Sequence, residues 1–286
     1  MQIRQIIIIV MLAAIMAFPN LSVGAILSNK ERHIKLVLES SSAIIIEQET
    51  GKIIFEKKAG KKKAIASITK LMTAMVVLDS NMSLNAPITI SREDVDRQRW
   101  SKSKLSIGQT LSRREMLKLA LMSSENRAAY ALARSYYGGT NAFVEAMNRN
   151  AAKLGMNDTT FFGPTGLDAR NVSTARDLAI MVKAAYEYQQ IRKMSTSVSH
   201  SINDHSQRII FSNTNRLVKD NGWKIGLSKT GYISDSGKCL VMQATLGGVP
   251  TIIVLLDSWG ISSRIVDAIR VKRWLAHSKD QYSIRG

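Results

Sequence analysis

Cysteine is almost absent from this chain of 286 residues, whose single cysteine is Cys239. One cysteine forms no internal disulfide and makes no metal site by itself. Histidine is also scarce, and its four occurrences show no helical metal-ligand spacing: His33, His200, His205 and His277. We therefore expect no metal and no other cofactor. The stretch KCLVMQATL around Cys239 is typical of a strand, which favours a buried structural thiol over a reactive one.

Acidic residues are outnumbered, since 22 Asp and Glu stand against 40 Lys and Arg and leave a net charge of +18. Such a surface suits polyanions, among them nucleic acid, acidic lipid and acidic cell-wall polymer. The sequence contains no RNA-binding signature, zinc-finger spacing or helix-turn-helix pattern, so we expect no nucleic-acid partner. Loose electrostatic contact with an acidic wall or membrane surface is the expectation that remains.

The N-terminus lacks a hydrophobic run long enough to span a membrane. Arg4 precedes an uncharged apolar run from Ile6 to Phe18, which is shorter than the roughly 20 residues of a spanning helix. The small residues of Val23–Ala25 follow. This layout predicts a signal peptide over residues 1–25, cleaved after Ala25, with an uncleaved anchor as the alternative. The mature protein, residues 26–286, is then expected to be a single domain that is not transmembrane.

Internal repeats and low-complexity linkers are missing too, and the order of patterns indicates the fold class. Residues 42–59, SAIIIEQETGKIIFEKKA, read as a hairpin, and helical spacing dominates the middle of the chain. Three strand-like runs over residues 223–257 predict an antiparallel meander, before a closing helix over 262–277. This order predicts an α+β fold: an antiparallel sheet flanked by helices, with an inserted all-helical lobe over roughly 85–190.

What the chain does have is a serine and a lysine three residues apart at a predicted helix start, in AIASITKLMTA. In one interpretation Ser67 caps the helix and Lys70 points to water. In the other, Ser67 is a nucleophile, and a desolvated Lys70 is the base that takes its proton. The second interpretation requires a neutral lysine at working pH, and burial together with a second cation nearby would lower its pKa.

Two further motifs favour the catalytic interpretation. Ser124, Glu125 and Asn126 lie between two predicted helices, and Lys229, Thr230 and Gly231 lie on a predicted strand. Each motif alone is common, and each has an ordinary alternative: Ser124 and Asn126 as helix caps, Lys229 as a solvated edge-strand lysine. The order S-x-x-K, S-x-N, K-T-G, each in its expected setting, is a strong signal. Glu125 is expected to face solvent.

These motifs identify the chain as similar to the serine penicillin-recognising enzymes, and within them to the low-molecular-mass D-alanyl-D-alanine peptidases. FFGPTGLD and STARDLA resemble elements of that family as well. SSENRAA, SGKCLVM and VLLDSWG are most similar to its D-alanyl-D-alanine endopeptidases, the penicillin-binding protein 7/8 group. The resemblance covers nearly all of the mature chain and implies the β-lactamase/D,D-peptidase-like fold.

The resemblance implies catalytic roles for three side chains. Ser67 would attack the carbonyl of a D-Ala peptide bond and become acylated. Lys70 would accept the proton of Ser67, its pKa depressed by burial and by the charge of Lys229. Ser124 would relay a proton to the leaving amine. Which residue is the acylation base is disputed across this superfamily.

It also implies substrate-binding roles. Asn126 would hydrogen-bond the substrate backbone, while Lys229 and Thr230 would meet a carboxylate. Gly231 would let the substrate lie against the strand without a side chain in the way. The oxyanion would sit between the backbone N–H groups of Ser67 and Tyr232.

The implied activity is endopeptidase cleavage of D-Ala–diaminopimelate cross-bridges in peptidoglycan, in the periplasm, with peptidoglycan peptides as substrates and β-lactam antibiotics as inhibitors. A D-alanyl-D-alanine carboxypeptidase is the first alternative. A β-lactamase is disfavoured because no ExxLN-type stretch, the usual source of a deacylating glutamate, occurs between residues 127 and 228. A non-catalytic wall-binding module is disfavoured because all three motifs are intact.

Overall fold

The computed structural model describes residues 35–204, 207–260 and 262–283. The signal peptide predicted over residues 1–25 lies outside this described part. The chain divides into two units, and the fold below is that of the second, which begins at Leu36. Among the described residues, no helix is both long and apolar enough to cross a membrane.

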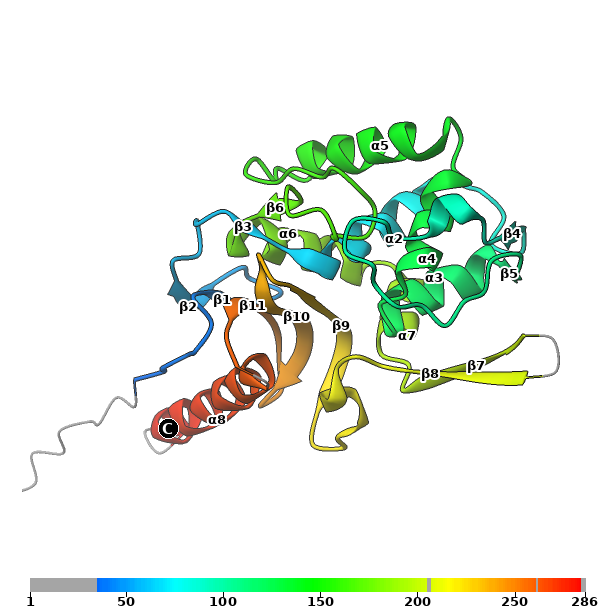
Figure 1. Ribbon diagram of the computed structural model, residues 1–286. Helices are drawn as coiled ribbons and strands as arrows, with labels where there is room; N and C mark the ends of the chain where they lie inside the picture. The colour runs from blue at the N-terminus through cyan, green and yellow to red at the C-terminus, as the bar shows by residue number, and fades with distance from the viewer. Residues whose placement is uncertain (1–34, 205–206, 261, 284–286) are drawn as a thin grey trace, which may run out of the picture. The chain divides into compact units, whose positions relative to one another are not determined.

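The main sheet is antiparallel throughout and contains the predicted hairpin and meander (Figure 1). In spatial order its strands are β2 (Ile53–Lys57), β1 (Ser42–Glu47), β11 (Val249–Ser258), β10 (Gly237–Leu246) and β9 (Lys224–Ile233). The last strand in this order, β9, is an edge of the sheet and carries the K-T-G motif.

Three two-stranded sheets lie outside the main sheet. They pair β3 (Lys63–Ala64) with β6 (Val172–Ser173), β4 (Pro87–Thr89) with β5 (Thr110–Ser112), and β7 (Ser199–Asp204) with β8 (Gln207–Ser212). The first of these pairings joins segments more than a hundred residues apart. It holds the chain just before Ser67 against the chain just before the helix that starts at Ala175.

Helices fill the middle of the chain, as predicted, and one closes it. The α-helices are α2 (Lys70–Asp79), α3 (Arg113–Met122), α4 (Asn126–Arg134), α5 (Gly139–Lys153), α6 (Ala175–Tyr186), α7 (Gln189–Ser195) and α8 (Ser263–Ser283). Short 3-10 helices are η2 (Ala66–Thr69), η3 (Arg92–Asp94) and η4 (Arg216–Lys219). Sheet and helices together confirm the predicted α+β class.

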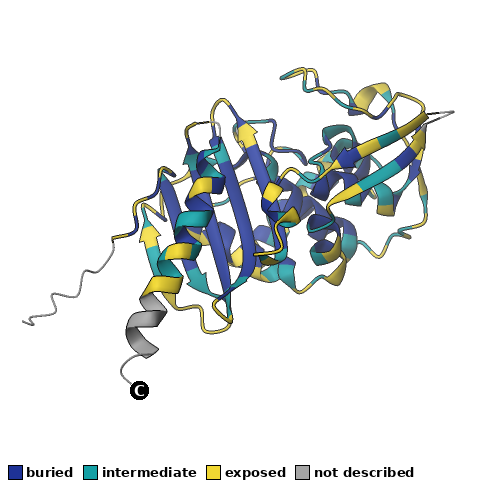
Figure 2. Cartoon of the chain, turned by 90° about the horizontal axis from the view of Figure 1, so that it is seen from below, coloured by how far each residue is buried: buried dark blue, intermediate teal, exposed yellow. Residues whose placement is uncertain are grey.

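Helices cover both faces of the main sheet. Because successive strand residues point to opposite faces, Ile44 packs in the core shared with α6, and Ile45 packs in the core beneath α8. This explains why the strand motifs are continuous apolar runs and not alternating ones. In Figure 2 the middle of the sheet is buried, while the helix leading to the C-terminus turns an exposed stripe outward.

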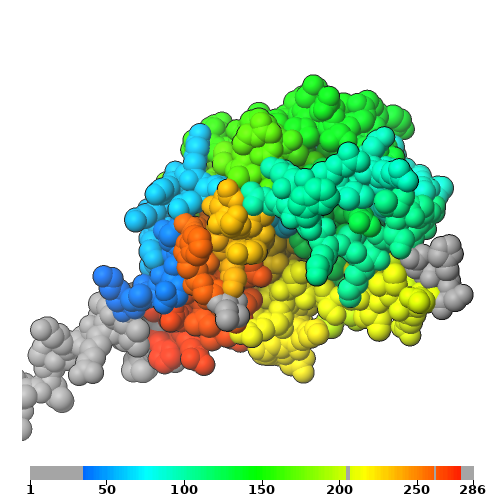
Figure 3. All heavy atoms as spheres, in the orientation of Figure 1, coloured from blue at the N-terminus to red at the C-terminus, as the bar shows by residue number. Residues whose placement is uncertain are grey.

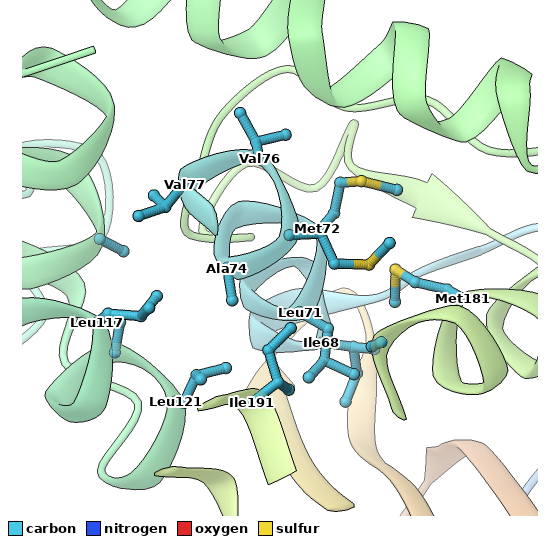
Figure 4. Close-up of a cluster of buried hydrophobic side chains, with 14 of the residues drawn as sticks. Ile68, Leu71, Met72, Ala74, Val76, Val77, Leu117, Leu121, Met181 and Ile191 are labelled. Carbon is cyan, nitrogen blue, oxygen red and sulfur yellow. The ribbon is translucent and has the colours of Figure 1, made fainter. Parts of the chain in front are cut away.

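Helix α2 runs through the interior of the larger core. Its apolar residues pack against α3, α6 and α7 (Figure 4), through Leu117 and Leu121, Met181 and Ile191 respectively. Replacing a residue buried to this degree, such as Leu71, by alanine costs about 2–5 kcal/mol of stability. The core therefore fixes the helix that begins at Lys70.

Helices α3, α4 and α5 lie beside α2, and α6 contacts both α2 and the sheet. The start of α3 has the capping box of Ser112 and Glu115, in which each side chain accepts the other residue's backbone N–H. The limits predicted for the helical lobe, about 85–190, stay a prediction, as does the single domain over 26–286.

Candidate active site

Ser67 lies in η2, one turn before α2, at a strained point of the chain. Its neighbour Ala66 has a φ of +46°, a left-handed conformation that alanine rarely adopts and that functional sites often contain. No side-chain cap hydrogen bond is present at the start of η2 or of α2. The interpretation of Ser67 as a plain helix cap is therefore wrong.

The ammonium nitrogen of Lys70 meets three oxygens. Its Nζ lies 2.8 Å from Ser67 Oγ, 2.7 Å from Asn126 Oδ1 and 2.9 Å from the carbonyl oxygen of Thr165. The side chain is fully buried. Two of the three predicted motifs thus meet at one nitrogen atom, together with a carbonyl from FFGPTGLD.

Burial sets the acid–base chemistry of this lysine. Desolvation lowers the pKa of Lys70 from its ordinary 10.5 to about 7, although the nearby charge of Glu125 raises it. A neutral amine has two N–H groups and one lone pair. The oxygens of Asn126 and Thr165 accept only, so they take both N–H groups. The lone pair then faces Ser67 Oγ, the partner that can donate a proton.

The turn after Phe162 is what places the Thr165 carbonyl. Thr73 donates to the Pro164 carbonyl at 2.6 Å, and Asn171 Nδ2 donates to Thr69 Oγ1 at 3.1 Å. Gly166 packs directly on the strained segment, since a Cβ there would lie 1.8 Å from the oxygen of Ala66. Only glycine fits, which gives FFGPTGLD a physical role in holding η2.

The three residues of the S-x-N motif have different surroundings. Asn126 opens α4 with its side chain on Lys70, as described, while Ser124 has a φ of +63°. The hydroxyl of Ser124 has no hydrogen-bond partner within the described chain and is partly exposed. Glu125 is buried and caps α4 by accepting from the backbone N–H of Arg127 at 3.2 Å. The expectation that Glu125 faces solvent was wrong, and the cap is neither Ser124 nor Asn126.

Lys229 is buried as well, with 1% of its surface exposed. The alternative of a solvated edge-strand lysine is therefore wrong. Its Nζ donates to the carbonyl of Thr230 at 3.0 Å, and the Thr230 hydroxyl donates to Thr214 Oγ1 at 2.6 Å. Burial holds the pKa of Lys229 well below its ordinary value, and the charges of Lys70 and Arg264 lower it further. Burial is thus the cause of the lowered pKa of Lys70. The charge of Lys70 is in turn one of the causes that lower the pKa of Lys229.

Gly231 brings the sheet edge against the start of η2. A Cβ at this position would lie 3.0 Å from the oxygen of Ile65 and 3.1 Å from the amide nitrogen of Ser67. The space that a Cβ would need is filled by the chain around Ser67, so this close approach itself requires glycine. The expected role of Gly231, room for the substrate, stays a prediction. Tyr232 is the next residue of β9, and its N–H as an oxyanion donor stays a prediction.

The surface is hollowed between the cyan segment near residues 90–110 and the gold segment near 230–240 (Figure 3). Trp100 and Tyr232, one from each segment, are exposed at 74% and 60%. Arg99 crosses from the first segment to the second, donating from Nη2 to Asp235 Oδ2 at 2.7 Å. The hollow is thus bordered by the loop before α3 and the end of β9.

Several residues of the site lie outside the residues that the motifs predicted. They are Thr165 through its carbonyl, Thr214, Arg264, whose Nη1 donates to the Gly231 carbonyl at 2.6 Å, and Ser101, which accepts from Asn126 Nδ2 at 2.9 Å. Thr165, in FFGPTGLD, acts through a backbone atom, which no motif marks. Thr214, Arg264 and Ser101 act through side chains that lie outside the three motifs.

A serine hydrogen-bonded to a buried lysine of lowered pKa, beside the amides of a helix start and a sheet edge, is the arrangement of a serine hydrolase that forms acyl-enzymes. Residues 29–259 match the S11 peptidase family described as D-alanyl-D-alanine carboxypeptidase. The chain belongs to this family of serine peptidases, as its resemblance indicated.

Two curated relatives have the same name. A D-alanyl-D-alanine endopeptidase of Pseudomonas aeruginosa is 44% identical over 240 residues, which cover 83% of this chain and 77% of the relative. A D-alanyl-D-alanine endopeptidase of Escherichia coli is 40% identical over 244 residues, covering 85% and 79%.

Among solved structures, the DD-transpeptidase of Streptomyces K15 superposes with a TM-score of 0.78 at 28% identity. The match covers 84% of this chain and 98% of that one. The likeness confirms the predicted D,D-peptidase-like fold.

Proposed function

We propose that this protein is a D,D-endopeptidase that cleaves D-Ala–diaminopimelate cross-bridges in peptidoglycan through an acyl-enzyme on Ser67. The observation that carries the chemistry is the Lys70 nitrogen, whose N–H groups are committed to two acceptors while it faces Ser67 Oγ at 2.8 Å. The names of the 44% and 40% identical relatives support the choice of bond.

In the acylation step, Ser67 Oγ attacks the D-Ala carbonyl carbon as its proton passes to Lys70. The N–H groups of Ser67 and Tyr232 stabilise the oxyanion. The carbon–nitrogen bond then breaks as Ser124 gives its proton to the leaving amine and takes up the proton held by Lys70, which returns Lys70 to its neutral form. Water next hydrolyses the ester, which releases the peptide acid and restores the Ser67 hydroxyl.

The burial of Lys229 gives this lysine a part in selecting the substrate. In the free enzyme, burial and the charges of Lys70 and Arg264 oppose the charged form of Lys229. A substrate carboxylate held by Lys229 and Thr230 favours that charged form. A substrate with a carboxylate at this point is therefore bound more tightly than one without it.

A cross-bridge and a terminal D-Ala share these contacts. In the cross-bridge the leaving amine belongs to a residue whose own carboxylate lies beside the scissile bond, where Lys229 reaches it. The substrates differ only beyond this point, so the carboxypeptidase alternative needs a direct test. Purified cross-linked dimers and pentapeptide monomers should be offered side by side. We expect dimers to fall to monomers with little free D-alanine, and rapid D-alanine release with intact dimers would overturn the proposal.

The nucleophile has its own test. Benzylpenicillin should leave a stable covalent adduct on Ser67, mapped by mass spectrometry, and Ser67→Ala should abolish it. Fast loss of the adduct would favour the β-lactamase alternative. No adduct on a folded protein would favour a wall-binding module, and an adduct on another residue would refute the site.

We also propose secretion to the periplasm and loose attachment to acidic wall or lipid. The support is the N-terminal layout and the net charge of +18, of which cleavage after Ala25 removes only Arg4. Attachment through surface charge is screened by salt. Added salt should therefore release the protein from wall and membrane fractions, and a need for detergent would contradict this.

A further inference from the structure

The geometry points to Asp96 and Ser101 as positioning residues that fix the side-chain amide of Asn126, so that its oxygen and not its nitrogen faces Lys70. Neither residue belongs to the three motifs. The inference rests on the proposed roles of Ser67 and Lys70, and it concerns what orients them.

Asn126 bonds differently at its two ends. Oδ1 accepts from Lys70 Nζ at 2.7 Å, and Nδ2 donates to Ser101 Oγ at 2.9 Å. An amide turned by 180° would point its NH₂ group at Lys70. Lys70 would then have one acceptor fewer, and its lone pair could turn toward the amide and away from Ser67. The activation of Ser67 therefore depends on which way this amide points.

Ser101 decides that orientation only if its own proton is engaged elsewhere, because a hydroxyl both donates and accepts. Asp96 lies beside it. The backbone N–H of Ser101 donates to Asp96 Oδ2 at 2.8 Å, and the Ser101 side chain is close enough to this carboxylate to help lower its pKa. Because a carboxylate accepts only, we infer that the hydroxyl proton turns toward Asp96 and that a lone pair faces Asn126.

Asp96 is itself held in place. It is buried, and Oδ1 accepts from the backbone N–H groups of Gln98 and Arg99 at 2.9 and 3.1 Å. These bonds keep the pKa of Asp96 below its ordinary value despite its burial. The carboxylate therefore stays ionised, and acceptor-only, at every pH at which Lys70 is neutral.

The same loop is tied to the other acceptor of Lys70. Arg99 Nε donates to the carbonyl of Leu167 at 2.6 Å, two residues after Thr165. Asp96, Ser101 and Asn126 thus form one line of hydrogen bonds to Lys70. Arg99, which lies between Asp96 and Ser101 in sequence, anchors the turn that supplies the Thr165 carbonyl to Lys70.

Ser101→Ala is the first test, since it removes the hydroxyl and little else. We expect the rate constant for acylation by benzylpenicillin to fall about tenfold with an unchanged melting temperature. Ser101→Thr, which keeps the hydroxyl, should recover most of the rate. Ser103→Ala is the matched control in the same loop: its hydroxyl accepts from the Leu105 N–H and does not touch the site. It should stay within twofold of wild type.

Asp96→Asn tests the direction of the hydrogen bonds. An amide accepts at one atom only, so it can hold Gln98 and Arg99 but loses the acceptor for Ser101. We expect a loss of acylation at least as large as that of Ser101→Ala. The acid limb of the pH profile should also move to lower pH, since Lys70 loses an oxygen that stabilises its charged form.

A double-mutant cycle separates positioning from general damage. If Ser101 acts through Asn126, Ser101→Ala should cost nothing further in an Asn126→Ala background. An undiminished loss there, or a wild-type rate for Ser101→Ala, would overturn the inference. The proposed function fails separately: Ser67→Ala would then still be acylated.

Discussion

The site contains two buried lysines, and the chain surrounds them differently. Lys70, on the helical side, is met by oxygens of Ser67, Asn126 and Thr165. Lys229, on the sheet side, has a single hydrogen bond within the described residues, to the carbonyl of Thr230. A buried cation short of partners is costly unless a ligand completes it. Lys70, on the helical side, therefore has its hydrogen-bond partners in the free protein. Lys229, on the sheet side, gains further partners only when a substrate binds.

The largest expected effect comes from removing the amine of Lys70. Lys70→Met keeps the apolar stem and deletes the base, so acylation should fall on the order of 10²–10⁴-fold. Wild-type acylation should rise with pH through about 7, the pKa of Lys70, and the variant should lose this rise. Stopped-flow acylation measures both. Lys193→Met, an exposed lysine of α7, is the control, and a loss below tenfold would remove Lys70 from the role of base.

The sheet side should show a smaller effect that depends on the ligand. Lys229→Ala should lower kcat/KM by at least about tenfold, or roughly 1.4 kcal/mol of transition-state binding, because a charge-assisted contact to a carboxylate is lost. Benzylpenicillin and its methyl ester should be compared as acylating agents. Wild type should discriminate strongly between them, and the variant only weakly. Equal discrimination by both would mean that the carboxylate binds elsewhere.

Acylation should be sensitive to a single methyl group at Gly231, where β9 lies against the chain around Ser67. In Gly231→Ala the new Cβ meets backbone atoms of Ile65 and Ser67 at 3.0–3.1 Å, so β9 must shift by a few tenths of an ångström. We expect acylation to fall several-fold, because the oxyanion donors move apart, with a small change in melting temperature. Gly60→Ala, where a Cβ meets nothing within 4 Å, is the control. Unchanged acylation would show that the oxyanion donors tolerate the shift.

The smallest effect is a change in pH dependence. The charge of Glu125 raises the pKa of Lys70, so Glu125→Gln should lower that pKa below about 7. Lys70 then stays neutral to lower pH, and the acid limb of acylation should move down by less than about one pH unit. The amide oxygen keeps the cap on Arg127, so stability should be nearly unchanged. A shift to higher pH would contradict this sign.

The sequence alone led to the serine peptidase family, the α+β class, and the hairpin and meander. These follow from local patterns: period, turn residues and three short motifs, each of which marks side chains that must be of one chemical type. Ser67 and Lys70 are one turn apart on the same segment, so their spacing predicts their meeting.

Only the tertiary structure decided which way those side chains are held. The bond from Lys70 to Thr165 spans 95 residues and ends on a carbonyl, an atom that every residue carries and no motif marks. Glu125 was expected to face solvent because its side chain is charged, yet packing buries it near Lys70. At Gly231 the fold places the chain around Ser67 where a side chain would go, a close approach that no motif marks. Burial, charge repulsion and hydrogen-bond direction arise between segments brought together by the core, and that is why sequence named the reacting groups and only the fold set their states.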